Sequence, residues 1–214
     1  MIISIANVKG GVGKSTISMN VAGALSHKGN SVLLIDADPQ GSVADWYKVR
    51  MTNKDRVIDK NIKILSYDYE DLKTKLKNES KNHNHTIIDC PPEDDKIMYA
   101  CLILSDFVII PITPSPFDIR SAHKTIENIK QGIKSEHIKI KPWIIISKKI
   151  VGTVLGRELR KTLQVFKLPI FKTEISQRIS VCEAGITGMT ILEYAPGSPS
   201  GKEFKALGEE IKKW

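Results

Sequence analysis

The sequence predicts a doubly wound α/β fold, in which a mostly parallel sheet carries helices on both of its faces. One observation behind this prediction is a set of continuous apolar runs, such as residues 31–36 and 86–89, that lack the alternation of half-exposed strands. Another is the alternation of strand-like and helix-like segments along the chain, which favours parallel strands joined by right-handed crossovers. The third is a glycine-rich stretch within residues 7–19 that joins an apolar run to a helical pattern.

The elements are expected in a regular order. Strands are predicted at residues 1–6, 31–36, 62–65, 86–89, 107–111, 138–146 and 169–171. Helices are predicted at residues 15–27, 43–50, 69–77, 94–104, 119–133 and 154–166. A capping box formed by Ser200 and Glu203 is expected to start a last helix, and the polar residues 77–85 are expected to form a loop. The 214 residues, 41% of them hydrophobic and without an internal repeat, predict a single domain over residues 1–214.

The basic residues are unevenly distributed along the chain. The net charge of +8 lies entirely in residues 107–214, because residues 1–106 hold equal numbers of basic and acidic side chains. Residues 139–172 contain nine Lys and Arg residues against one acid, Glu158. A solvated surface normally mixes both signs, so this one-sided run indicates a polyanionic partner.

The cysteines and the apolar runs exclude several classes of protein. Cys90, Cys101 and Cys182 are odd in number and show no C-x-x-C pair, which argues against a disulfide framework and against a zinc site. No apolar run approaches the roughly 20 residues that cross a bilayer, and the first strand is not preceded by a cleavable signal. We therefore expect a cytoplasmic protein.

The glycine-rich stretch has the composition of a phosphate-binding loop. Gly10, Gly11 and Gly13 lack a Cβ atom, so the loop can curl with its N–H groups pointing toward phosphate oxygens at the positive end of the next helix. Lys14 adds a full positive charge, and Ser15 adds a hydroxyl suited to Mg²⁺. The stretch therefore predicts a nucleotide site.

One departure from the general pattern G-x-x-x-x-G-K-[ST] is informative. The chain has Val8 where the pattern has its first glycine, and it has an extra lysine, Lys9. Residues 9–16 read K-G-G-V-G-K-S-T, which resembles the deviant Walker A box of the ParA/MinD family of P-loop NTPases. A chance glycine loop is the alternative, and the eight-residue match disfavours it.

The resemblance implies specific roles in the loop. ATP would be bound through Lys9, Gly10, Gly11, Val12, Gly13, Lys14, Ser15 and Thr16. Lys14 would act on phosphate charge within its own subunit, and Lys9 would reach across a nucleotide-sandwich homodimer to the partner's ATP. Both lysines are therefore expected to be catalytic.

Two strand ends carry carboxylates that suit the same site. Asp36 and Asp38 belong to D-A-D-P-Q, which resembles the switch I motif of ParA proteins; a plain turn with an Asx cap is the alternative. By that resemblance Asp38 orients or activates the attacking water, and Asp36 helps to hold Mg²⁺. Asp89 begins D-C-P-P, which resembles the family's Walker B and switch II segment, and it would contact the Mg²⁺ shell.

Two further loops resemble the family less closely. Residues 111–118 resemble the loop that packs at the nucleotide and the dimer interface, which implies nucleotide contacts for Pro111 and Pro114. Many relatives place an asparagine after the sixth strand to bind adenine, whereas this chain has Ser147, Lys148 and Lys149. The adenine contacts could therefore come from the main chain.

A basic helix and a later arginine are candidates for DNA contact. The pattern places Leu155, Leu159, Leu163 and Phe166 toward the core, and Arg157, Arg160 and Lys161 share another face. Two interpretations of these cations stay open, namely an ordinary solvated helix face and a surface that binds DNA phosphates. Arg178 matches the arginine of an R-x-x-x-x-E-A segment near the DNA-facing surface of small ParA proteins.

Together the motifs resemble a short ParA-type DNA partition ATPase. The resemblance implies ATP and Mg²⁺ as cofactors, a homodimer formed with ATP, non-specific DNA binding, and a centromere-binding partner protein that stimulates hydrolysis. Such a protein would be nucleoid-associated when bound to ATP. A MinD-like membrane-cycling regulator and a metabolic P-loop enzyme are the alternatives. The last helix has Phe204, Leu207, Ile211 and Trp214 on one side, and we expect that side to pack in the core without stable membrane association.

Overall fold

The computed structural model describes residues 1–27, 29–52, 59–92, 95–135 and 139–214. The strands within these ranges form one seven-stranded sheet in the order β3-β2-β4-β1-β5-β6-β7, and all neighbouring strands are parallel. Their bounds are β1 Ile2–Ile5, β2 Val32–Asp36, β3 Ile62–Ser66, β4 His85–Asp89, β5 Phe107–Ile112, β6 Lys141–Lys149 and β7 Ile170–Ser176. The predicted doubly wound fold is confirmed.

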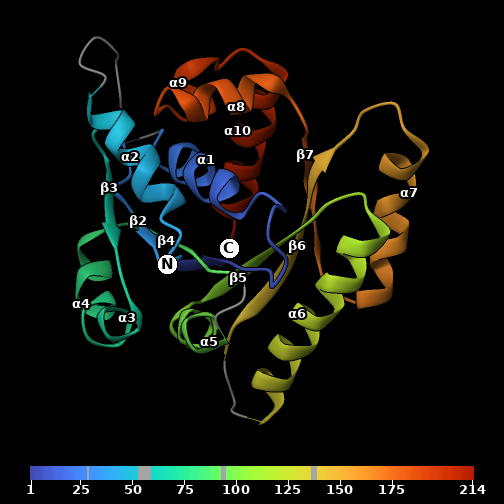
Figure 1. Ribbon diagram of the computed structural model, residues 1–214, viewed down its shortest axis with the longest axis horizontal. Coiled ribbons are helices and arrows are strands. Elements are labelled where there is room, and N and C mark those ends of the chain that lie inside the picture. Colours follow the sequence, from blue (N-terminus) through green and yellow to red (C-terminus); the bar gives the residue numbers. More distant parts are fainter. Residues whose placement is uncertain (28, 53–58, 93–94, 136–138) are drawn as a thin grey trace.

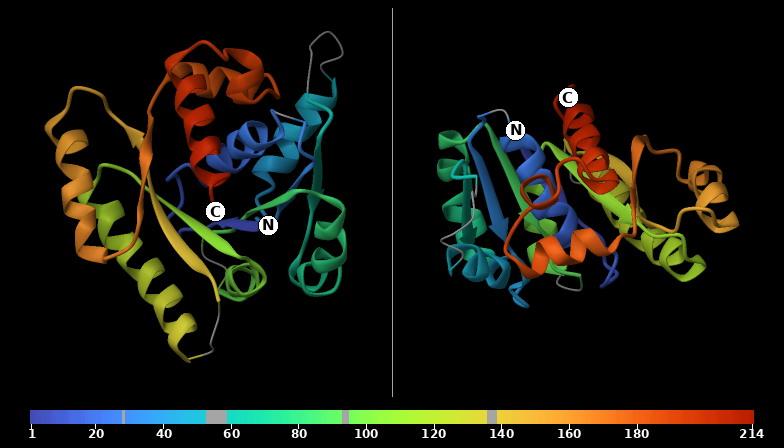
Figure 2. Two further views of the ribbon diagram at one scale, coloured as in Figure 1. Left: turned by 180° about the vertical axis from the view of Figure 1, so that it is seen from behind. Right: turned by 90° about the horizontal axis from the view of Figure 1, so that it is seen from above.

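Helices cover both faces of the sheet (Figure 1; Figure 2). One core layer joins α1, α2, α8, α9 and α10 to side chains such as Val32 and Leu34, and the other joins α3, α4, α5, α6 and α7 to side chains such as Leu33 and Ile35. Alternate residues of β2 are thus buried on opposite faces, which explains its continuous apolar sequence. The helix bounds are α1 Lys14–Ser26, α2 Ser42–Thr52, α3 Tyr69–Thr74, α4 Leu76–Glu79, α5 Asp95–Leu104, α6 Pro116–Ser135, α7 Val154–Leu163, α8 Ile179–Ile186, α9 Ile191–Tyr194 and α10 Pro199–Ile211.

The predicted capping box of the last helix is wrong. Helix α10 starts two residues earlier than a cap at Ser200 would allow, because Ser198 is the N-cap, accepts a hydrogen bond from the N–H of Gly201, and precedes Pro199 in the first turn. Glu203 instead accepts hydrogen bonds from the N–H and the hydroxyl of Ser176. A capping box does occur at α9, between Thr190 and Glu193. The N-cap of this helix is therefore the serine two residues before Ser200.

Other boundaries also differ from the prediction. The helix predicted at residues 69–77 is divided into α3 and α4, and a 3₁₀ turn at Ser80–Asn82 replaces part of the predicted loop. Strand β6 begins at Lys141 and extends to Lys149, and the predicted starts at Ile138 and Asp94 lie outside the described residues. In α7, Gly156, Leu159 and Leu163 are buried, whereas Leu155 is exposed.

The apolar side of α10 packs in the core, as predicted. Phe204, Leu207 and Ile211 are fully buried in the layer that contains α1. Trp214 stacks on Phe107 with ring centroids 4.2 Å apart and also contacts the rings of Trp143 and Phe171. Within the described ranges, no helix combines the length and apolar character that a membrane crossing requires.

The sheet register brings the predicted site residues to one edge. Asp36 at the end of β2 is the direct neighbour of Asp89 at the end of β4, and Ile5 at the end of β1 is the neighbour of Asp89 on its other side. The glycine loop follows Ile5, so it starts beside both carboxylates. In a parallel sheet this carboxyl edge is where ligands bind.

Candidate nucleotide-binding site

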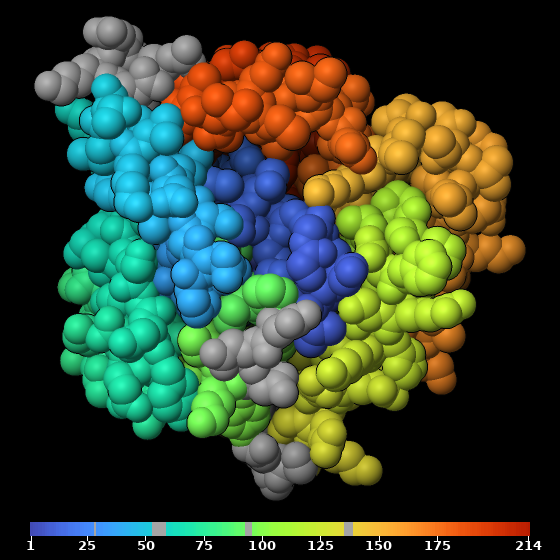
Figure 3. All heavy atoms as spheres, in the orientation of Figure 1, coloured from blue at the N-terminus to red at the C-terminus, as the bar shows by residue number. Residues whose placement is uncertain are grey.

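The glycine loop connects β1 to α1 and lies open on the surface. Figure 3 shows this N-terminal segment in dark blue at the centre of one face of the molecule, between the cyan and yellow-green segments. Gly11 and Gly13 adopt left-handed backbone conformations, with φ of 79° and 93°, which other residues adopt only with strain. Gly13 is the N-cap of α1 and has no side chain to accept a bond from the first turn, whose N–H groups remain available for an anion.

Lys14 is buried at the start of α1, with 6% of its surface exposed. Its Nζ donates to the carbonyl oxygen of Lys9 at 3.1 Å, so the ammonium lies across the loop. Burial lowers the pKa of Lys14, while the nearby carboxylates of Asp89 and Asp38 act in the opposite direction. A phosphate at this position would compensate the desolvated charge.

The loop entry is held by residues that the sequence analysis did not identify. Buried Asn7 donates through Nδ2 to the carbonyl of Pro111 at 2.8 Å, and its Oδ1 accepts from the N–H of Lys9 at 3.0 Å. The Thr125 hydroxyl accepts from the N–H of Val8 at 3.1 Å and donates to Asn7 at 3.2 Å. Helix α6 therefore fixes the loop from 117 to 118 residues away, a distance at which no local motif could indicate it.

The structure also shows where some of the predicted nucleotide-binding residues lie. Pro111 is buried at the loop entry, and Pro114 lies half-buried beyond the end of β5. The side chain of Lys9 is exposed, as a residue that acts on a second subunit must be. The individual roles of Val12, Gly10 and the two prolines toward ATP stay predictions.

Asp89 is the carboxylate best suited to a cation. It is completely buried, its Oδ1 accepts from the Ser18 hydroxyl at 2.9 Å, and the nearby Ser15 hydroxyl lowers its pKa. Its Oδ2 has no hydrogen-bond partner among the described residues. Burial raises the pKa of Asp89 to about 7, against the two hydroxyls, which lower it. A cation at the orphan oxygen would favour the ionised form.

These features fit Mg²⁺ better than an all-protein metal cage. The described residues contain no group of three or more His, Cys, Asp and Glu side chains that could hold a metal ion. Mg²⁺ is usually held by one or two carboxylates together with waters and substrate phosphates. Ser15 and Asp89 would supply the protein's part of such a shell.

Asp36 is occupied by backbone hydrogen bonds. Its Oδ2 accepts from the N–H of Ala44 at 2.8 Å and its Oδ1 from the N–H of Asp38 at 3.2 Å, so it ties the loop after β2 to the start of α2. Burial raises the pKa of Asp36, while these N–H groups lower it. Its part in holding Mg²⁺ stays a prediction.

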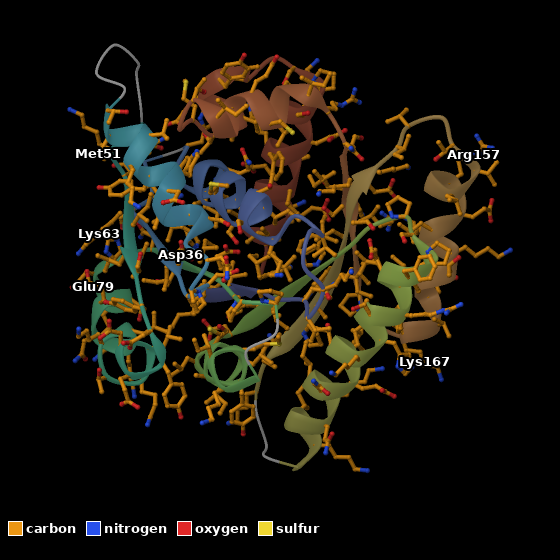
Figure 4. All side chains as sticks on the ribbon, viewed as in Figure 1. Asp36, Met51, Lys63, Glu79, Arg157 and Lys167 are labelled. Atoms are coloured by element: carbon orange, nitrogen blue, oxygen red, sulfur yellow. The ribbon has the colours of Figure 1, made fainter. Side chains whose placement is uncertain are left out.

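Asp38 sits in the next turn and is half-buried. Its Oδ1 accepts from the N–H of Gln40 at 2.9 Å, which is the Asx turn that the sequence left open as the alternative reading. Its other carboxylate oxygen is not engaged by that turn, so the turn and a role toward water are compatible. Figure 4 labels Asp36, the last residue of β2, in the left half of the view.

A cavity of about 170 Å³ adjoins the loop on the side of β6 and β7. Gly13 and Thr16 line it from the loop side, Ser147 and Lys148 from β6, and Gln177, Arg178 and Val181 from the start of α8. Ser147 is buried and its hydroxyl donates to the carbonyl of Val12 at 2.9 Å. The residue that stands where many relatives have asparagine is thus used to hold the loop.

The predicted DNA contacts fall into two environments. Arg157 and Lys161 are exposed on α7, and Figure 4 labels Arg157 and Lys167 at the outer edge of the molecule. Arg160 instead pairs with Glu174, Nε to Oε1 at 2.9 Å, and donates to the carbonyls of Phe171 and Lys172. Arg178 lies 3.8 Å from Glu203 and lines the cavity beside the loop. Three of the four predicted contacts thus lie on α7, whereas Arg178 lies just before α8.

The sequence as a whole matches a known family model. A model described as CobQ/CobB/MinD/ParA nucleotide binding domain matches residues 3–191. The maintenance of carboxysome distribution protein A of Halothiobacillus neapolitanus is 30% identical over 211 residues, covering 98% of this chain and 95% of that protein. The sporulation initiation inhibitor protein Soj of Bacillus subtilis is 26% identical over 248 residues, covering 98% and 97%.

Solved structures agree in fold. The apo McdA structure from Cyanthece superimposes with a TM-score of 0.79 at 21% identity and covers 98% of each chain. The match of the family model over most of the chain and the near full-length relative at 30% identity lead to one assignment. The chain belongs to the CobQ/CobB/MinD/ParA family of nucleotide-binding domains and is a ParA/MinD-type ATPase.

Proposed function

We propose that this ATPase is a ParA-type DNA partition ATPase. ATP would close two subunits into a sandwich dimer, the dimer would hold DNA without reading its sequence, and hydrolysis would release the DNA. The observation that carries the proposal is the one-sided charge of residues 139–172, which hold nine basic residues and only the acid Glu158. Lys149 and Arg160 of this run pair with Glu174 outside it, whereas Arg157 and Lys161 are exposed and are available to attract a polyanion.

The position of these cations supports the proposal. Of the three predicted contacts on α7, Arg157 and Lys161 are exposed and Arg160 is partly used by Glu174. Lys167, just after the helix, is exposed as well. One subunit would therefore present few phosphate contacts, and a dimer would present twice as many, which makes DNA binding depend on ATP. Arg178 would add a contact only at the rim of the nucleotide cavity.

The nucleotide site would work as follows. Lys14 and the first-turn N–H groups of α1 would hold the phosphates, and Lys9, whose side chain is exposed, would reach the nucleotide of the second subunit. Asp38 would orient the attacking water. Ser15 and Asp89, with Asp36 nearby, would hold Mg²⁺, which would neutralise charge on the phosphate oxygens. Hydrolysis in such a site would be weak until a partner protein stimulates it.

Residues 1–214 would act as a single P-loop ATPase domain, cytoplasmic and nucleoid-associated when bound to ATP. The stimulating partner would be a protein bound at a centromere-like DNA site. A second candidate cargo is a protein body, because the relative with 30% identity is named for carboxysome distribution. The two cargoes would differ in the partner protein and share the ATP-dependent dimer.

A MinD-like membrane cycle is less well supported by the structure. The apolar side of α10 is buried against α1, and Trp214 is stacked on Phe107. A membrane-binding amphipathic helix must instead present its apolar face to lipid. Sedimentation with anionic vesicles tests this directly, and ATP-dependent binding to vesicles without binding to DNA would replace the partition proposal.

The decisive experiment is DNA retention on a surface with ADP, with ATP and with a non-hydrolysable ATP analogue. Retention is expected with the two triphosphates only, with no preference for sequence. It should fall with salt at a log–log slope of about −0.9 per neutralised phosphate. The double variant Arg157→Glu, Lys161→Glu should lose retention and still dimerise with ATP.

A matched control separates local contact from net charge. Lys205 is an exposed lysine of α10, away from α7, so Lys205→Glu makes the same type of charge reversal outside the proposed surface. It should change retention much less than the single variants Arg157→Glu and Lys161→Glu, each of which changes the net charge by the same amount as Lys205→Glu. Equal losses in both proteins would mean that only the overall charge matters, and retention with ADP would contradict the proposed cycle.

A further inference from the structure

We propose that Lys148 is a nucleotide-contacting residue of this ATPase, an ammonium of the same subunit that binds the phosphate chain beside Lys14. The resemblance to the family assigns this position no such role, because relatives often carry asparagine in this region. The inference depends on the nucleotide site alone and is independent of DNA as the ligand of the dimer.

The backbone turns Lys148 toward the glycine loop. Lys148 has a φ of 51°, a left-handed conformation that residues with a side chain rarely adopt. The pairing of β6 with β7 shifts register between Ile144 and Ile146 and again before Lys149, so the irregular strand end surrounds this residue. Such conformations persist where the surrounding structure imposes them, and they cluster at ligand sites.

The side chain crosses the mouth of the loop. Its Nζ donates to the carbonyl oxygen of Gly11 at 2.6 Å. A Cβ atom built on Gly13 would lie 3.7 Å from Cε of Lys148 and 3.0 Å from Oγ of Ser147. The end of the lysine stem therefore lies beside Gly13, and its ammonium binds the carbonyl of Gly11, so the side chain contacts both left-handed glycines of the loop.

The same side chain lines the adjoining cavity of about 170 Å³, together with Gly13 and Thr16. A nucleotide with its phosphates at the start of α1 and its nucleoside in this cavity would pass beside Lys148. The ammonium of Lys148 would thus lie between the nucleoside and the terminal phosphates, next to the phosphate that is bonded to the ribose.

Among the residues that the structure describes, none supplies a carboxylate partner for the charge of Lys148. Lys149 and Arg160 both pair with Glu174, whereas no carboxylate of the described residues lies within 4.0 Å of Lys148. Its acceptor is the neutral carbonyl of Gly11. A phosphate oxygen is a stronger acceptor for an ammonium than a carbonyl, and the flexible lysine stem lets Nζ move from one to the other.

A purely structural role of Lys148 would change the melting temperature and the ligand affinities differently from a role in phosphate binding. If Lys148 only braces Gly11, its removal should lower the melting temperature of the ligand-free protein and weaken every ligand equally. If Lys148 binds phosphate, its removal should leave that melting temperature unchanged and should weaken ligands according to their phosphates.

The test measures dissociation constants of ADP, AMP and adenosine for wild type, Lys148→Ala and Lys148→Arg, with Lys149→Ala as the neighbouring control. Lys148→Ala should weaken ADP about tenfold, which is the lower range for a charge-assisted hydrogen bond because the side chain is exposed. Adenosine binding should be unchanged, Lys148→Arg should retain most of the ADP affinity, and Lys149→Ala should bind ADP like wild type.

The outcomes are distinguishable from a failure of the proposed function. Unchanged ADP affinity in Lys148→Ala, or equal weakening of ADP and adenosine, would overturn the inference and leave the partition proposal intact. A wild-type protein that binds no ADP would overturn both. If Lys148→Ala loses DNA retention while its ADP affinity is unchanged, Lys148 acts in DNA binding and the inference about phosphate is overturned.

Discussion

The buried ion pair between Arg50 and Glu193 gives the sharpest prediction about stability. Arg50 of α2 has 2% and Glu193 of α9 has 11% of its side chain exposed. The guanidinium donates to Oε1 at 2.6 Å and to Oε2 at 2.8 Å, in a bidentate arrangement, and it lies over the ring of Trp46. Glu193→Gln keeps the shape of the side chain and removes its charge.

The expected loss of stability follows from these contacts. The carboxylate of Glu193 also accepts from the N–H of Asp59 at 2.6 Å and from the N–H of Thr190 at 2.7 Å. Glu193→Gln leaves the Arg50 charge buried without its counter-charge, and breaking a buried pair in this way costs about 3–5 kcal/mol. For a chain of this size that is a fall in melting temperature of roughly 6–20 °C.

The pKa of Glu193 adds a pH dependence. Burial alone would raise the pKa, but the hydrogen bonds from Arg50, Asp59 and Thr190 outweigh it and hold the pKa below its usual value. The pair therefore contributes its full stability above the unfolded pKa of Glu, and this contribution is lost as the pH falls through the lower folded pKa. Glu193→Gln should lack that part of the acid destabilisation.

The assay is urea unfolding followed by circular dichroism at pH 7 and at pH 4. A double variant, Arg50→Met with Glu193→Met, serves as control, because replacing both charges by apolar groups should recover much of the loss. A loss below about 1 kcal/mol for Glu193→Gln would refute the argument, since surface ion pairs alone reach that value.

Three further predictions concern the site and one packing position. Lys14→Ala should abolish nucleotide binding, measured by calorimetry, because the buried ammonium and the loop N–H groups act together; unchanged ATP affinity would contradict the site. Asp38→Ala should dimerise with ATP but hydrolyse it slowly, whereas Lys9→Ala should bind ATP without forming a productive dimer, by light scattering and phosphate release. Gly188→Ala should destabilise the fold by more than about 1 kcal/mol in urea, because φ is 69° and a Cβ would lie 2.4 Å from the N atom of Arg50; a neutral effect would show that this contact can relax.

The local sequence determined the fold class and the position of the phosphate loop. The apolar runs at Val32–Ile35 and at Ile87 and Ile88 indicate strands buried on both faces, and each run ends in an aspartate. Gly11 and Gly13 are the residues that the left-handed turns require. These features depend on short stretches of chain, in which backbone sterics and burial decide the outcome before any distant contact forms.

The tertiary structure decided what lies far apart in sequence. Thr125 supports the loop entry across more than a hundred residues. Ser198 caps α10 in place of the predicted box at Ser200, and Glu203 of that box instead accepts from Ser176. The charge pattern of residues 139–172 did not show that Arg160 is held by Glu174 while Lys148 is directed at Gly11. Which cation is paired and which is left for a ligand depends on neighbours that only the folded sheet brings together.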